Sequence, residues 1–108
     1  MTHDEVRCQH AAVWTQLFAT RGPEVQAAAA GLVEQAADLY AMCWALRRVI
    51  ERSGVIKVHP EHPELQRPVP AVREYARLAE SYAAIVNKLT RLLGPGEDAE
   101  ADELDEYR

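Results

Sequence analysis

Prolines are concentrated in one short segment of this sequence, residues 54–70. Four of the six prolines lie there: Pro60, Pro63, Pro68 and Pro70. Each proline fixes its own φ, removes a backbone donor, and disfavours the helical conformation in the residue before it. The segment is therefore predicted to be extended or polyproline-like and to break the chain between two long helical patterns.

Two helices are predicted before this connector. Apolar residues at helical spacing predict a short amphipathic helix over residues 4–20, with Thr2 or Asp4 as its N-cap and Gly22 and Pro23 as its stop. A second helix of about 30 residues is predicted to begin at Pro23 and to end with Gly54 as its C-cap. Its apolar positions follow intervals of 4 and 3, which is a heptad seam: Val25, Ala29, Leu32, Ala36, Leu39, Cys43, Leu46 and Ile50.

A third long helix is predicted after the connector and ends at residues 94–96. Its seam is accompanied by a second apolar row, and two rows are more than one antiparallel neighbour can cover. We therefore expect an all-α fold, with a short N-terminal helix and an antiparallel hairpin of two long helices, that self-associates through residues 1–95. The expected oligomer interface consists of Leu32, Leu39, Tyr40, Leu46, Tyr75, Leu78, Tyr82, Ile85, Leu89 and Leu92.

The net charge of −5 comes from the end of the chain. Residues 96–108 hold seven acids against one arginine, whereas the remaining residues hold eleven Lys and Arg against ten Asp and Glu. So acidic a segment cannot bury enough apolar surface to stay ordered alone. It is either a solubilising tail or a segment that folds on a partner, and the partner-binding residues would be Glu97, Asp98, Leu104 and Tyr107.

The sequence shows little catalytic chemistry. His59 and His62 lie among prolines and two glutamates, but no second ligand cluster completes a metal site. No phosphate-binding glycine loop or nucleophile–base pair is evident, and no apolar run reaches the length of a membrane span. Cys8 and Cys43 are expected to be free thiols in a cytoplasmic protein. We therefore predict no enzyme activity, no cofactor and no metal.

Basic residues flank the connector on both sides. An antiparallel hairpin would gather them at one end, where they could contact DNA phosphates without reading bases. The alternative is that they are solvated helix-end charges paired with Glu51, Glu64 and Glu74. The candidate nucleic-acid-binding residues are Arg47, Arg48, Arg52, Lys57, Arg67, Arg73 and Arg77.

Three features occur in a recognisable order: an Arg-rich helix end leading into Glu51-Arg52-Ser53-Gly54, the turn Val58-His59-Pro60, and a long helix that opens Val72-Arg-Glu-Tyr-Ala-Arg-Leu-Ala. Together they resemble the small terminase subunit of tailed phages and prophages, over about residues 14–94. Two features depart from the family pattern. Only one helix fits in residues 4–20, where many members carry a helix-turn-helix domain, and the chain ends in an acidic tail.

The resemblance implies a non-catalytic DNA-packaging protein of the host cytoplasm. Such a subunit forms a homo-oligomeric ring, binds double-stranded viral DNA, and recruits and regulates the large terminase subunit, with no membrane or small-molecule substrate. Two alternatives remain at this point. One is a helical scaffolding or antitoxin-like regulatory oligomer that binds only protein, and the other is a small metal-dependent enzyme with His59 and His62 as ligands.

Overall fold

The computed structural model describes residues 1–53, 56–58, 66–68 and 70–94. Helix α1 spans His3–Leu17, α2 spans Pro23–Ser53 and α3 spans Pro70–Leu93. Two short strands, β1 (Ile56–Val58) and β2 (Gln66–Pro68), pair antiparallel between α2 and α3. The expected helical fold with three helices is confirmed, and the paired strands are an addition that the helical periodicity did not predict. None of the described helices is long and apolar enough to cross a membrane.

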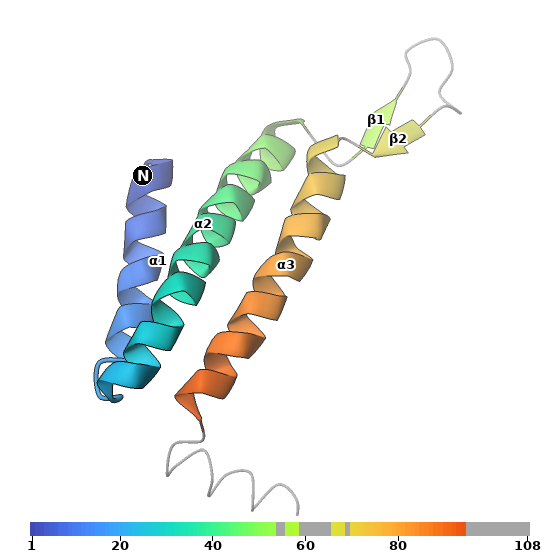
Figure 1. Cartoon of the computed structure of the whole chain (residues 1–108). Helices are drawn as coiled ribbons and strands as arrows, with labels where there is room; N and C mark the ends of the chain where they lie inside the picture. The colour runs from blue at the N-terminus through green and yellow to red at the C-terminus, as the bar shows by residue number, and fades with distance from the viewer. Residues whose placement is uncertain (54–55, 59–65, 69, 95–108) are drawn as a thin grey trace, which may run out of the picture.

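Helix α2 lies between the other two helices (Figure 1). Helix α3 runs alongside it in the opposite direction, and the shorter α1 packs against the first part of α2. The last turns of α2 and the first turns of α3 therefore lie at the same end of the molecule, and the β1–β2 ribbon extends beyond that end. The other end carries the turn between α1 and α2 and the C-terminus of α3.

Local signals set most of the helix ends. The Thr2 hydroxyl accepts a hydrogen bond from the Glu5 backbone N–H at 3.1 Å, which makes Thr2 the N-cap of α1. Helix α2 begins at Pro23, as expected from its missing N–H. Gly94 ends α3 with φ of 69°, a left-handed conformation that favours glycine. The predicted cap at Gly54 lies outside the described residues.

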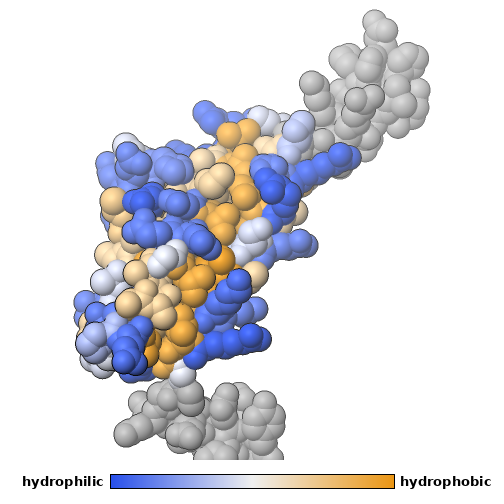
Figure 2. Space-filling model, viewed as in Figure 1, coloured by the Kyte–Doolittle hydropathy of each residue, from blue (hydrophilic) through white to orange (hydrophobic). Residues whose placement is uncertain are grey.

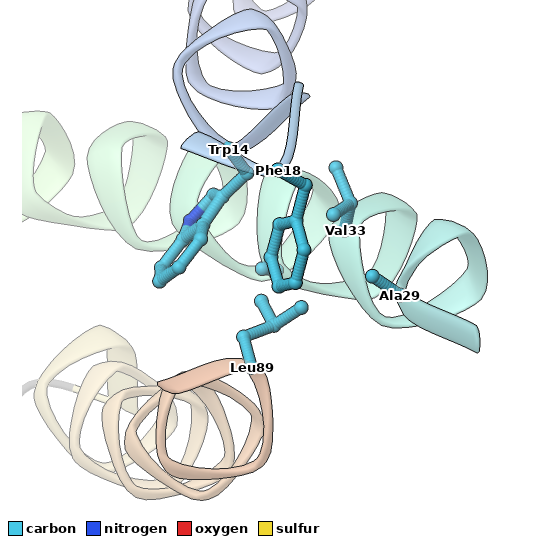
Figure 3. Packing of buried hydrophobic residues seen from close by; sticks show 6 residues of the cluster. Trp14, Phe18, Ala29, Val33 and Leu89 are labelled. Carbon is cyan, nitrogen blue, oxygen red and sulfur yellow. The ribbon is translucent and has the colours of Figure 1, made fainter. Parts of the chain in front are cut away.

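The core forms where all three helices meet (Figure 3). Trp14 of α1 and Phe18, the residue after this helix, pack with α2 and with Leu89 of α3, which is 0 % exposed. The α2 side of this core consists mostly of small side chains, with Ala36, Ala37 and Ala41 all fully buried. Such small side chains allow the backbones of neighbouring helices to approach α2 closely.

Polar contacts fix the position of α1. Arg7 donates to Asp38 from Nε and to Glu34 from a terminal nitrogen, each at 2.7 Å, and thereby joins the first half of α1 to α2. The Arg21 guanidinium donates to the Leu93 carbonyl at 3.0 Å and ties the α1–α2 turn to the end of α3. These contacts join α1 to α2 and the α1–α2 turn to the end of α3.

Candidate functional site

The basic residues of the helices lie at one end of the molecule. Arg47, Arg48 and Arg52 are exposed in the last two turns of α2, and Arg73 and Arg77 are exposed near the start of α3. Lys57 and Arg67 occupy directly opposed positions of the β1–β2 ribbon. The fold therefore brings basic residues from α2 and α3 to the same end, next to the ribbon (Figure 1).

These arginines differ in their surroundings. Arg77 is paired with the carboxylate of Glu74 one turn before it, and this hydrogen bond holds the pKa of Glu74 below its ordinary value. Arg77 thus fits the alternative of a paired helix-end charge. The guanidinium carbon of Arg48 instead lies 4.9 Å from the centroid of the Trp44 ring, a cation–π contact. The ring therefore orients Arg48 without neutralising its charge.

The predicted interface residues divide into three environments. Leu78 and Leu89 are buried within the chain and cannot contact another subunit in this conformation. Tyr40 is 41 % exposed. The others are half-buried: Leu32, Leu39, Leu46, Tyr75, Tyr82, Ile85 and Leu92. Of these, Leu32, Tyr82, Ile85 and Leu92 also pack against the core cluster of the chain itself.

One long face of α2 carries no charge. Between residues 25 and 46, the charged residues of α2 are Glu34 and Asp38, and both are paired with Arg7 of α1. Leu32, Leu39 and Leu46 repeat every seven residues and so lie in one row on a different side of α2, turned away from α1. Figure 2 shows a hydrophobic stripe along the face formed by α2 and α3, with hydrophilic residues on either side.

Small and flexible side chains lie beside the row formed by Leu32, Leu39 and Leu46. Ala28 and Gly31 are exposed, and Met42 is 42 % exposed. A Cβ added at Gly31 would meet no atom within 4 Å, so packing within the chain does not require glycine there. Glycine in a helix interior costs about 0.5–1 kcal/mol relative to alanine. We call this surface, formed by Ala28, Gly31, Leu32, Leu39, Met42 and Leu46, the α2 face.

A polar cluster joins the three helices on the side of α2 that faces α1. His10 of α1 stacks on Tyr40 of α2 with ring centroids 4.0 Å apart and parallel planes. Its Nε2 accepts a hydrogen bond from the Trp14 indole N–H at 3.1 Å and lies 2.9 Å from the Tyr82 hydroxyl of α3. The indole nitrogen is only a donor, so its bond requires an unprotonated Nε2, whose single lone pair then also faces the Tyr82 hydroxyl.

Burial in this cluster affects both titratable partners. It lowers the pKa of the His10 imidazole below the ordinary value of 6.5, which favours the neutral ring that these hydrogen bonds require. Burial also raises the pKa of Tyr82, with Tyr40 contributing in the same direction, so the hydroxyl remains a donor. The sequence analysis missed this cluster. The available signals were the spacing of His10 and Trp14, one turn apart, and the position of both tyrosines on the inner seams of their helices.

Several predicted site residues lie outside the described part of the chain. They are the candidate tail contacts Glu97, Asp98, Leu104 and Tyr107 and the connector histidines His59 and His62. Within the described ranges, no group of three or more His, Cys, Asp or Glu residues could hold a metal ion. Cys8 is exposed and Cys43 half-buried, and both are free thiols.

Comparison of the chain with protein-family models, with curated proteins and with solved structures finds no match. The α2 face and the basic end, formed by Arg47, Arg48, Arg52, Arg73 and Arg77, are therefore the features from which a function is inferred.

Proposed function

We propose that the protein is a non-catalytic small terminase subunit that acts in the cytoplasm of a phage-infected host. In this role it assembles into a ring, contacts double-stranded viral DNA through its basic end, and recruits the large terminase subunit. The order of motifs along residues 14–94 supports the family. The observation that carries the proposal is the α2 face, because a ring subunit needs a surface that another copy covers.

The chemistry of the α2 face suits another helix of the same kind. Its leucines would bury apolar area, and its small residues would let a second backbone approach closely. Contiguous exposed apolar surface is unfavourable in an isolated monomer and is typical of protein–protein contacts. Glu34 and Asp38, the charged groups in this part of α2, share one arginine, Arg7, and lie on the α1 side, away from the row of leucines.

The oligomeric state tests this part of the proposal. We expect the parent protein to be larger than a dimer by mass measurement in solution at micromolar concentration. Leu39→Glu places a charge in the centre of the α2 face and should shift the assembly to smaller species. Ala83→Glu adds the same charge at an exposed position of α3 and should leave the assembly unchanged. A monomeric parent would rule out the ring.

DNA binding tests the second part. Reversal of Arg47, Arg48 and Arg52 to Glu should abolish binding to long duplex DNA. In the parent, the affinity should fall with salt, with a slope of about −0.9 for each phosphate neutralised. Lys88→Glu with Arg91→Glu reverses two charges near the opposite end of α3 and serves as the control. Equal loss in both variants would show that binding depends only on total charge.

The tail is the proposed contact with the large subunit. Removal of residues 96–108 should leave helicity and assembly intact and should weaken capture of the large subunit. Loss of assembly would instead assign the tail a structural role. A dimer that binds no DNA would favour the second candidate function, a scaffolding or antitoxin-like regulatory oligomer, because that function requires only the apolar α2 face.

A further inference from the structure

The Arg48–Trp44 contact lies on α2 beside the start of α1. Trp44 lines the same hollow as Met1 and Val6, so it marks the level at which α1 begins. Arg48 and Arg52 follow Trp44 at four-residue intervals and lie one and two turns further along the same side of α2. The row Trp44, Arg48 and Arg52 thus continues past the N-terminus of α1 to the basic end.

These three residues line one surface hollow, together with Ala45, Val49 and Glu51. The Trp44 ring is half-buried, whereas Arg48 and Arg52 are exposed. A half-buried aromatic ring has a fixed position, and a guanidinium held at 4.9 Å from its centroid loses much of its rotational freedom. A cation–π contact uses the charge of the guanidinium and leaves its N–H groups free to donate, and no acceptor among the described residues hydrogen-bonds them.

We infer that Trp44 is a positioning residue that holds the Arg48 guanidinium ready to bind a phosphate of duplex DNA. This inference rests on the proposed DNA contact and identifies Arg48 as a candidate basic residue that is preorganised for it. Arg77 differs because Glu74 already occupies its guanidinium. An arginine ordered before binding loses less side-chain entropy when the phosphate arrives, so the ring contributes to affinity without touching DNA.

A double-mutant cycle on the full-length protein tests this role. Arg48→Gln should weaken binding to duplex DNA about tenfold. The slope of log affinity against log salt concentration should also decrease in magnitude by about one, the value for one lost phosphate contact. Trp44→Leu keeps an apolar side chain but removes the π face, and should weaken binding about threefold while Trp44→Phe largely restores it. In the double variant Trp44→Leu with Arg48→Gln, the loss should equal that of Arg48→Gln alone, because Trp44 acts only through Arg48.

Two measurements separate positioning from a purely structural role. Unfolding in urea reports whether Trp44→Leu disturbs packing near the start of α1. A variant with parental stability and weaker binding supports positioning, and Arg48→Lys, which keeps the charge but not the planar fork, should behave like Trp44→Leu. Glu51→Gln removes the acid that lines the hollow and should strengthen binding.

The outcomes also distinguish this inference from the proposed function. Additive losses from Trp44→Leu and Arg48→Gln, or full affinity in Trp44→Leu, would overturn the role of Trp44 and leave the DNA contact standing. A parent protein without affinity for duplex DNA at low salt would overturn both.

Discussion

The cluster around His10 provides the sharpest stability prediction, because the His10 Nε2 atom contacts the Trp14 N–H of α1 and the Tyr82 hydroxyl of α3. His10→Phe keeps an aromatic ring on Tyr40 but removes the acceptor for the Trp14 N–H and the Tyr82 O–H. An intramolecular hydrogen bond contributes about 0.5–1.5 kcal/mol, and a donor left unpaired in the interior costs about 1–3 kcal/mol. Both bonds are only partly buried, so we expect a loss of about 1–2 kcal/mol at pH 8.

The pH dependence identifies the cause of this loss. Burial lowers the pKa of His10 in the folded state below its ordinary value of 6.5, so folding favours the neutral ring. The stabilisation is therefore complete above about pH 6.5 and decreases as the pH falls from the unfolded-state pKa to the folded-state pKa. Since Phe does not titrate, the difference in stability between parent and His10→Phe should be largest at pH 8 and smaller at pH 5.

Urea unfolding at both pH values, followed by circular dichroism, measures this difference. The protein concentration must be the same throughout, because assembly adds its own stabilisation. His3→Gln changes an exposed histidine of the same helix and serves as the control for the loss of a histidine. A penalty for His10→Phe that is equal at pH 5 and pH 8 would refute the assigned hydrogen bonding, as would a variant more stable than the parent at pH 8.

Two further predictions concern packing. Leu89→Ala should lower the free energy of unfolding by about 3 kcal/mol in denaturant titration, because Leu89 is 0 % exposed where the three helices meet. A loss below about 1 kcal/mol would contradict that packing. Gly31→Ala should stabilise the unassembled chain by about 0.5–1 kcal/mol, because the added methyl group meets no atom within 4 Å. Gly31→Leu places a large side chain on the α2 face and should weaken assembly in sedimentation experiments. A destabilised Gly31→Ala chain at low concentration would show that the helix needs glycine for its own fold.

The helix positions were predictable because their signals are local. Thr2 caps α1 through its own hydroxyl, and Pro23 starts α2 without losing a hydrogen bond. The end of α1 was less accurate: the expected helix ran to residue 20, but α1 stops at Leu17. The reason is tertiary, since Phe18 enters the core just after the helix and Arg21 binds the Leu93 carbonyl of α3.

The distribution of burial was harder to predict. The heptad seam of α2 contains both alanines and leucines, and the pattern does not say which of them pack within the chain. The structure buries Ala29 and Ala36 completely or nearly so and leaves Leu32 and Leu39, which were predicted at contacts between subunits, half-buried. A helix packed between two others has little room for large side chains on its two inner sides. This constraint comes from the neighbouring helices and is not evident from the α2 sequence alone.

The His10 cluster also required tertiary information. Tyr40 and Tyr82 were expected at contacts between subunits. The structure places both rings against His10, a polar residue whose role depends on partners 30 and 72 positions away along the chain. Similarly, the arginine count at the end of α2 was evident from the sequence, but the contact between Arg48 and the Trp44 ring was not.

The buried alanines of α2 have a consequence for how the bundle orders. An alanine side chain has no rotamers to lose, so Ala36, Ala37 and Ala41 are enclosed at almost no cost in side-chain entropy. They also offer no alternative arrangement, because a methyl group cannot turn away from a neighbour. The larger side chains of α1 and α3 opposite these alanines must therefore change rotamer when the helices pack. Helix α2 offers a surface of fixed shape, and α1 and α3 pack against it.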